Sequence, residues 1–236
     1  LFASEIKALL AHPGLDLTLD RSALFDYVTY QYIPAPKSVY ARIRKLPSGH
    51  TLVFERGELR IAPYWDVQFS DETFTEDQAI ARVQHVLREA VDMRLVADVP
   101  LGVFLSGGVD SSVITATMAA LQRDPVKSFT IGFEGATESE VHYARLVAKH
   151  CHTDHHERTL PRESVETMLP WAAATYDEPF ADPSAMPTYL VSRTARENVI
   201  VILSGDGGDE LFCGYPWYAY WLLLRPFDLL PLSLRR

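Results

Sequence analysis

The sequence contains few cysteines, fewer basic than acidic residues and no long hydrophobic run. Its 236 residues include only two cysteines, Cys151 and Cys213, which cannot form a disulfide framework and fit a reducing compartment. Lys and Arg total 22 against 31 Asp and Glu, and the formal net charge of −9 disfavours nucleic acid as a partner. The longest apolar run, 217–224, is shorter than the roughly 20 residues that a membrane span needs. We therefore expect a cytoplasmic protein that binds neither nucleic acid nor a membrane.

The amino end lacks both an initiator methionine and the layout of a signal peptide. Because the sequence opens on Leu1 and Phe2, we expect the chain to be a fragment of a longer protein. Its apolar share of 47% and charged share of 22% are ordinary for a globular protein with a sizeable core. At about 150 residues per domain, the length corresponds to roughly one and a half domains.

Two regions of different character divide the chain. Residues 1–72 are punctuated by turns and rich in predicted β-structure, with short helices expected at 4–10 and 21–30 and a hairpin with strands at 51–54 and 59–61. The sequence Thr75-Glu76-Asp77-Gln78 has the pattern of a capping box, and the apolar residues after it recur at the spacing of an amphipathic helix. We place the boundary between residues 68 and 75, which gives domains 1–72 and 73–236.

In the second domain, apolar strands alternate with helices. Strands are expected at 99–105, 128–133, 155–159 and 199–203, and helices at 112–121, 138–150, 162–176 and 188–197. This alternation predicts an α/β fold with a parallel, doubly wound sheet. Ligands of such sheets bind at the carboxyl ends of the strands, where two loops of unusual composition follow.

The first loop is Leu105-Ser106-Gly107-Gly108-Val109-Asp110-Ser111-Ser112. Its glycines let backbone N–H groups approach a ligand, its serines add hydroxyl donors, and the start of the next helix favours an anion. The loop therefore has the chemistry of a phosphate cradle, although it is neither a Walker A loop nor a dinucleotide fingerprint. Asp110 would repel a phosphate unless a divalent cation lay between them, which predicts Mg²⁺ here. The competing interpretation is an ordinary N-cap turn.

The second loop, Leu203-Ser204-Gly205-Asp206-Gly207-Gly208-Asp209-Glu210, also follows an apolar strand and enters a helix. Three glycines and three acids within six residues cannot form a packed core, although a solvated turn at an acidic helix start would also explain them. Beside the first loop, Asp209 is the natural second Mg²⁺ ligand together with Asp110. Asp206 is then free to face a reacting carboxyl group or an incoming amine.

Together these segments resemble a known enzyme family. Residues 106–112 are similar to the pyrophosphate loop of the N-type ATP pyrophosphatases, and paired with 203–215 they resemble the synthetase domain of glutamine-hydrolysing asparagine synthases. The opening segment Phe2-Ala3-Ser4-Glu5-Ile6-Lys7-Ala8-Leu9 is similar to the end of that family's glutaminase domain, a class II glutamine amidotransferase of the Ntn type. The resemblance spans nearly the whole chain. It implies an adenine nucleotide alpha hydrolase-like sheet preceded by the β-rich end of a glutaminase domain.

The resemblance implies ATP-dependent amide synthesis. A carboxylate, most simply aspartate, attacks the α-phosphorus of Mg-ATP, pyrophosphate leaves, and ammonia from glutamine displaces AMP to give asparagine. It also implies Mg²⁺ at Asp110 and Asp209, and catalysis by Asp206, where asparagine synthases often carry Glu. The implied ATP-binding residues are Leu105, Ser106, Gly107, Gly108, Asp110, Ser111, Ser112, Ile131, Ser204 and Gly205. The expected partners are these small-molecule substrates, with a homodimer left open.

The sequence departs from the family pattern at several points. It begins downstream of the amino-terminal Cys nucleophile and of the glutamine-binding residues, so we expect no glutamine hydrolysis by this chain alone. No lysine follows Lys149, although the family uses one well after the second loop, and Cys213 stands where the family usually has Gly. The expected acceptor loop, 176–184, has no Arg for a substrate carboxylate, unlike well-studied asparagine synthases. The acceptor could therefore be another carboxylate, such as a sugar acid of a surface polysaccharide.

Two other functions stay open from the sequence. One is a different enzyme with the first loop, such as an NAD or GMP synthetase or a tRNA-thiolating enzyme. Thiolating enzymes usually need a basic RNA surface or Cys pairs, and this sequence has neither. The amino-terminal segment further favours the asparagine synthases over the other enzymes. The other is a non-catalytic nucleotide-binding or regulatory module, against which the two metal ligands on opposed loops argue.

Two further clusters have ordinary explanations. The side chains of His150, Cys151, His152, His155 and His156 are candidate zinc ligands, but they straddle a predicted helix end and strand start. We therefore favour the interpretation that these histidines supply partial positive charge near a helix C-terminus. The aromatic residues between 215 and 221 would suit base stacking, but on an acidic protein we favour an amphipathic helix that packs on the sheet or on a missing carboxyl-terminal part.

Overall fold

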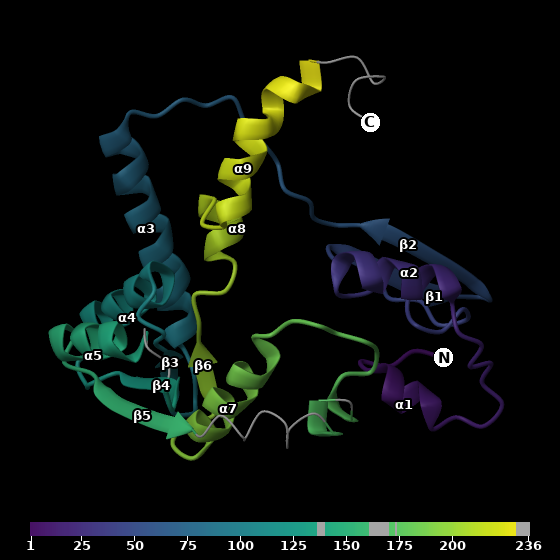
Figure 1. Cartoon of the computed structure of the whole chain (residues 1–236), viewed down its shortest axis with the longest axis horizontal. Coiled ribbons are helices and arrows are strands. Elements are labelled where there is room, and N and C mark those ends of the chain that lie inside the picture. Colours follow the sequence, from purple (N-terminus) through teal and green to yellow (C-terminus); the bar gives the residue numbers. More distant parts are fainter. Residues whose placement is uncertain (136–139, 161–169, 173, 230–236) are drawn as a thin grey trace. The chain divides into compact units, whose positions relative to one another are not determined.

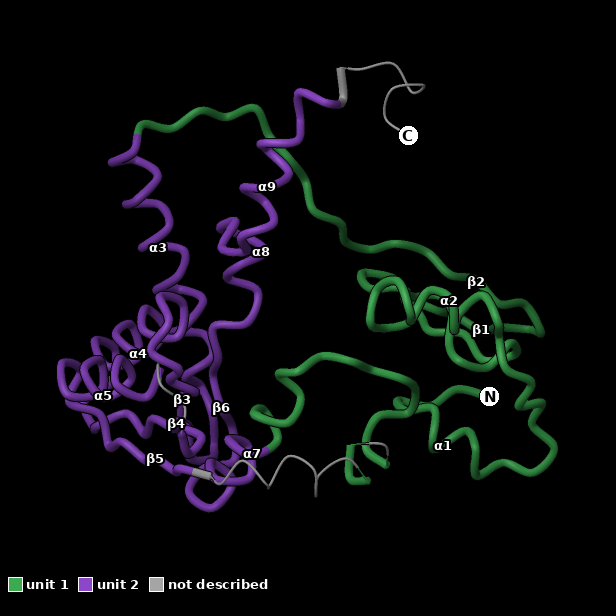
Figure 2. The backbone as a smooth tube through the Cα atoms, in the orientation of Figure 1, with its two compact units in different colours: residues 1–75, 162–189 green, residues 76–161, 190–236 purple. Residues whose placement is uncertain are grey.

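The computed structural model describes residues 1–135, 140–160, 170–172 and 174–229. The chain forms two compact units (Figures 1 and 2). The first comprises 1–75 with 162–189, and the second comprises 76–161 with 190–236. The units therefore divide the chain differently from the domains expected from the sequence, because 162–189 group with the amino-terminal residues.

A four-stranded parallel sheet lies in the second unit. Its strands are β3 (Leu101–Phe104), β4 (Lys127–Phe133), β5 (Asp154–Leu160) and β6 (Val201–Leu203), arranged in the order β5-β4-β3-β6. All three pairings are parallel. Because β4 and β5 extend the sheet on one side of β3 and β6 joins on the other, the strand order reverses between β3 and β6. In doubly wound sheets, ligands bind outside the carboxyl ends of the strands at such a switch point.

Helices α3 (Glu76–Leu95) and α4 (Val109–Leu121) cover one face of this sheet. Val91 of α3 and Met118 of α4 form a buried cluster there with Val103 of β3. The next helix, α5 (Val141–His150), packs Ala144 against Leu105, just past the end of β3.

The opposite face is covered by α7 (Ala185–Arg196). Successive side chains of a strand alternate between faces, so Phe104 points away from Val103 and packs with Phe129 and Ala195. Helices on both faces of a parallel sheet confirm the expected α/β doubly wound class.

After β6 the chain forms α8 (Gly208–Phe212), α9 (Pro216–Leu224) and the 3₁₀ helix η1 (Arg225–Leu229). No residue of α9 is buried, and Figure 1 shows this helix leading away from the sheet. Of the two surfaces that we expected this aromatic helix to cover, the sheet is therefore not the one. None of the helices in the described residues combines the length and the apolar character needed to cross a membrane.

The first unit contains α1 (Ile6–Leu10), α2 (Arg21–Tyr30) and an antiparallel hairpin of β1 (His50–Glu55) and β2 (Glu58–Pro63). The carboxylate of Asp20 caps α2 by accepting the N–H groups of residues 22 and 23. Arg56 and Gly57, the two turn residues, have φ of +53° and +85°, the handedness that matches the twist of a hairpin. The buried centre of this unit consists of Ala23, Ile33 and Val39.

The elements occur where the sequence predicted them, with shifted ends. The helix α2 covers the predicted residues, whereas α4 begins at Val109 instead of 112. The strand β3 begins at Leu101 rather than at 99, because Pro100 has no N–H to donate to a neighbouring strand. The predicted helix 162–176 lies largely outside the described residues. Those of its residues that the structure describes are helical at 170–172 and 174–175.

Candidate functional site

The loop between β3 and α4 is fixed against β4 and α5. Leu105 donates its N–H to the carbonyl of Phe129 at 2.9 Å, and the hydroxyl of Thr130 donates to the carbonyl of Leu105. Gly107 has a φ of +91°, and a Cβ at this position would lie 2.6 Å from the backbone nitrogen of Ala144. Both the backbone conformation and the close approach of α5 therefore require glycine here.

The serine hydroxyls of this loop are bonded within it. Ser106 Oγ accepts the N–H of Gly108 at 3.2 Å and lies 3.0 Å from Ser111 Oγ. The hydroxyls of Ser111 and Ser112 both donate to the carbonyl of Gly108. Among the described residues no side chain caps α4, so the N–H groups of its first turn remain available to an anion.

The loop between β6 and α8 turns sharply through its glycines. The hydroxyl of Ser204 donates to Asp206 Oδ2 at 2.9 Å. Gly207, with a φ of +89°, directs the chain into α8, whose first turn contains Asp209. Gly214 lies against this aspartate, and a Cβ there would clash with its carboxylate.

The two loops touch each other at Asp110. A Cβ on Gly205 would lie 2.8 Å from Asp110 Cβ and 2.9 Å from the backbone nitrogen of Ser111. A Cβ on Gly208 would clash with the Asp110 carboxylate itself. The second loop can therefore lie directly on the start of α4 only because these positions lack side chains. This contact places Asp110 beside the residue that precedes Asp209.

The residues of the site carry negative charge without basic partners. Within the part of the chain that the structure describes, the carboxylates of Asp110 and Asp209 form no hydrogen bond or ion pair, and Asp206 accepts only from Ser204. Unpaired carboxylate oxygens are the ligands that Mg²⁺ prefers. No set of three or more His, Cys, Asp and Glu side chains in the described residues is arranged to hold a metal alone. With two carboxylates, an ion held here would need its remaining oxygen ligands from elsewhere, such as a phosphate or water.

The remaining predicted residues lie at the same edge of the sheet or next to it. Ile131 is half-buried on β4, directly after Thr130, whose hydroxyl contacts Leu105. Asp206 is exposed, and no hydrogen bond in the described residues joins it to the first loop. The structure therefore brings Asp110 and Ser111 together with Gly205 and Gly208.

Comparison with family models identifies both parts of the sequence. The model described as "Asparagine synthase" matches residues 82–236, and the model described as "Glutamine amidotransferase domain" matches residues 1–65. The chain belongs to the asparagine synthase family.

Relatives within this family align over most of the chain. "Asparagine synthetase [glutamine-hydrolyzing] 1" of Bacillus subtilis is 34% identical over 100% of this chain and 37% of its own length. A "Putative asparagine synthetase [glutamine-hydrolyzing]" of Mycobacterium bovis is 38% identical over 99% of this chain and 37% of its own. "Amidase chyE" of Penicillium rubens is 29% identical over 96% and 36%. The chain thus spans little more than a third of the length of these relatives.

A solved structure with weak similarity is the NH3-dependent NAD synthetase from Campylobacter jejuni in complex with the nitrate ion. It aligns with 57% of this chain and 60% of its own, with a TM-score of 0.42 and 10% identity.

The structure adds a side-chain contact just after the second loop that the sequence did not indicate. The hydroxyl of Tyr215 donates to Glu210 Oε1 at 2.7 Å, and this bond raises the pKa of Tyr215 to about 12. The ring of Tyr215 stacks on Trp217 with centroids 4.2 Å apart. Cys213, at the usual glycine position of the family, has a φ of +57°. The left-handed backbone explains why glycine suits this position.

The histidine cluster does not converge on one point. His155 Nδ1 lies 2.8 Å from the hydroxyl of the buried Ser128, while His156 stacks on Phe129. The Nε2 atom of His155 is buried without a hydrogen bond in the described residues, and burial lowers the pKa of this imidazole. Burial also raises the pKa of the Cys151 thiol.

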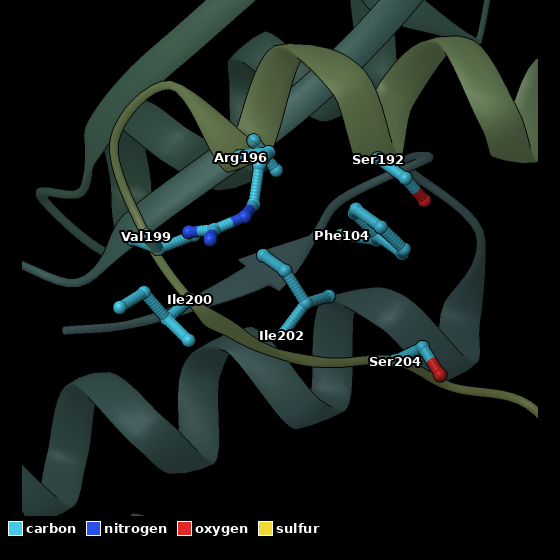
Figure 3. Close-up of a pocket in the computed structure, with 8 residues that line it drawn as sticks. Phe104, Ser192, Arg196, Val199, Ile200, Ile202 and Ser204 are labelled. Carbon is cyan, nitrogen blue, oxygen red and sulfur yellow. The ribbon is translucent and has the colours of Figure 1, made fainter. Parts of the chain in front are cut away.

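A cavity of about 290 Å³ lies between α7 and the sheet (Figure 3). Its lining residues are Phe104, Ser192, Ala195, Arg196, Val199, Ile200, Ile202 and Ser204. Ser204 is the one predicted site residue among them, so most of the candidate site lies outside this cavity.

Two of the three carboxylates in the expected acceptor loop accept hydrogen bonds from amino-terminal residues. Asp177 accepts the backbone N–H of Ile6, and Glu178 accepts that of Val39. These contacts lie within the first unit, which contains residues 162–189. Asp177 and Glu178 therefore act as structural acceptors in this conformation.

Proposed function

We propose that this chain carries the ATP-binding part of an enzyme that joins a carboxylate to ammonia as an amide. A carboxylate oxygen attacks the α-phosphorus of ATP, and the bond to pyrophosphate breaks. The ammonia nitrogen then attacks the acyl carbon of the adenylate, the bond to AMP breaks, and the excess proton passes to a nearby base. We assign this base to Asp206, which is exposed at the carboxyl end of β6.

The observation that supports this proposal is the contact of the two glycine-rich loops at Asp110. The uncapped start of α4 offers backbone N–H groups to the departing pyrophosphate. Gly205 and Gly208 bring the second loop against the same point. Fixed N–H dipoles aimed at developing negative charge stabilise a transition state without reorganising. The rest of the ATP contact would come from Leu105, Ile131 and Ser204.

Mg²⁺ fits the carboxylates of this site. Asp110 and Asp209 would hold it, because both carboxylates lack protein partners in the described residues. The ion would supply positive charge that offsets the repulsion between these acids and the phosphates.

Aspartate is the acceptor that we propose, with ammonia supplied from glutamine. Several relatives are named asparagine synthetases, which supports aspartate. A relative named an amidase supports a different carboxylate as the alternative acceptor. The acceptor is therefore decided by product analysis.

The test is to measure AMP and pyrophosphate release by the intact protein with Mg-ATP, ammonia and aspartate. Replacement Asp110→Asn should lower AMP release about 100-fold or more, because it removes a charge that positions the nucleotide's cation. The matched control is Asp124→Asn, an exposed carboxylate just after α4, which should leave the rate unchanged.

Each other result has a defined meaning. AMP release with another carboxylate but not with aspartate would keep the mechanism and change the acceptor. Formation of ADP and phosphate would contradict the adenylate mechanism. Mg²⁺-dependent ATP binding without AMP release would indicate a non-catalytic nucleotide-binding module.

A further inference from the structure

One stretch of the chain matches the asparagine synthase family model by sequence but groups with the amino-terminal residues in the structure. Residues 174–183 lie inside the range matched by the asparagine synthase model, 82–236, but group in the compact unit that contains residues 1–75. Figure 2 shows the described part of this stretch in the colour of the first unit. Two adjacent carboxylates, Asp177 and Glu178, make most of its polar contacts there.

Both carboxylate oxygens of Glu178 have partners. Oε2 accepts the N–H of Val39 at 3.1 Å, and Oε1 forms an ion pair with Lys45 Nζ. The same ammonium donates to the carbonyl of Ile33. The side chains of Glu178 and Lys45 are only 18% and 30% exposed, so water screens this pair less than it screens a surface pair.

Asp177 contacts residues of α1 in a similar way, through a backbone N–H and a lysine. Its Oδ2 atom accepts the N–H of Ile6 at 2.5 Å, and its Oδ1 atom lies 3.5 Å from Lys7 Nζ. Lys7 also donates to the carbonyl of Thr175 at 2.8 Å. Hydrogen bonds from backbone N–H groups to a charged acceptor are stronger than neutral ones. The two acids thus hold the stretch at two separate places of the amino-terminal region.

The stretch leads along the chain into the candidate site. The helix α7 begins at Ala185 and ends at Arg196, so it contains the boundary between the units at 189–190. The strand β6 comes next in the chain, and the second glycine-rich loop begins at the end of that strand. Only α7 and β6 therefore separate this stretch from the second glycine-rich loop along the chain.

We propose that Asp177 and Glu178 are positioning residues that fasten the synthetase sequence to the amidotransferase-like amino-terminal unit, so that ammonia from glutamine reaches the ATP site. This proposal rests on the function proposed above. The two carboxylates act through the placement of residues 174–183 within the first unit. Loss of Glu178 therefore lowers amide synthesis driven by glutamine and spares synthesis from free ammonia.

The experiment uses the full-length protein that carries this sequence, with Glu178→Gln, Lys45→Met and the double replacement. Hydrogen exchange at the Val39 amide and the ratio of glutamine-driven to ammonia-driven AMP formation are measured. In Glu178→Gln we expect about tenfold faster exchange at Val39, since a charged hydrogen-bond acceptor is lost. The activity ratio should fall by a similar factor while the ammonia-driven rate stays within about threefold. The double replacement should add little, because the two side chains form one pair.

The matched control is Glu197→Gln, which breaks an exposed ion pair with Arg158 inside the second unit. It should change neither the exchange at Val39 nor the activity ratio. Unchanged exchange and ratio in Glu178→Gln, or an equal fall of both activities, would overturn the proposal. If the unsubstituted protein makes no AMP from ammonia, the proposed function and this coupling both fail. The exchange data would still show whether Glu178 holds the Val39 amide.

Discussion

Single residues decide whether the two glycine-rich loops can approach each other. Gly107 adopts a positive φ directly beside α5, and Gly205 and Gly208 leave room for Asp110. At each of these positions a Cβ would overlap a neighbouring atom, so alanine would have to move backbone or the proposed metal ligand. Cys213 is the opposite case, because a side chain occupies a backbone conformation that glycine adopts more readily.

We expect the replacement Cys213→Gly to stabilise the second unit by about 0.5–1 kcal/mol, because it removes the cost of a Cβ at positive φ. The thiol is exposed, so no buried contact is lost. Urea titration of the variant and of Cys213→Ala measures the effect. The alanine variant keeps the Cβ and should show no gain; equal stabilities of the two variants would contradict this explanation.

At the level of elements, the pairing of β4 with β5 contains the most unusual polar group of the sheet. His155 on β5 bonds to Ser128 on β4, and its second ring nitrogen is buried without a hydrogen bond in the described residues. Burial is the main cause of its lowered pKa, and the positive charges of His156 and Arg145 add to it while Glu157 opposes it. Protonating this imidazole in the folded state is therefore unfavourable.

This strand pair predicts a pH dependence of stability. The unfolded chain protonates His155 near its ordinary pKa of about 6.5, whereas the folded chain does so only at lower pH. The unfolded state then binds more protons, so the free energy of unfolding decreases as the pH falls below about 6.5.

The replacement His155→Asn should flatten this dependence, since asparagine places an acceptor near Nδ1 but does not titrate. The replacement should also lower the free energy of unfolding at pH 7.5 by roughly 1 kcal/mol through altered hydrogen bonding. Urea titrations at pH 7.5 and 5.0 measure both effects, with the exposed His142→Asn as control. A pH dependence as steep as in the unsubstituted chain would show that His155 is not its source.

For the molecule as a whole, apolar surface is distributed unevenly. The sheet of the second unit is well covered, with Met118 and Phe129 fully buried on opposite faces. Other apolar side chains are open to solvent, including Phe54 of the hairpin and Leu223 of α9, which is 72% exposed. Apolar side chains that gather on an exposed surface favour association between protein chains.

We expect Leu223→Lys to change the free energy of unfolding by less than about 0.5 kcal/mol, because this side chain packs on little. By contrast, Met118→Ala should lower the free energy of unfolding by about 2–5 kcal/mol, because it leaves a cavity in the core. Urea unfolding measures both, and sedimentation should show weaker self-association for Leu223→Lys. A large stability loss in that variant would mean that α9 packs on the rest of the unit.

The local sequence determined the order of helices and strands, because periodicity and turn residues are properties of neighbouring positions. It also determined that two glycine-rich, acidic loops follow apolar strands, and the family resemblance followed from those same short segments. The ends of elements were less accurate, as at β3, where the missing N–H of Pro100 shortens the strand.

Only the tertiary structure decided which of these residues meet. The hydroxyls of Ser111 and Ser112 donate to the carbonyl of Gly108, and Gly208 lies against Asp110. Glu178 pairs with Lys45 across 133 positions of sequence, although its sequence context placed it in an acceptor loop. Contacts over such separations depend on how the whole chain packs, and no local pattern of residue types specifies them.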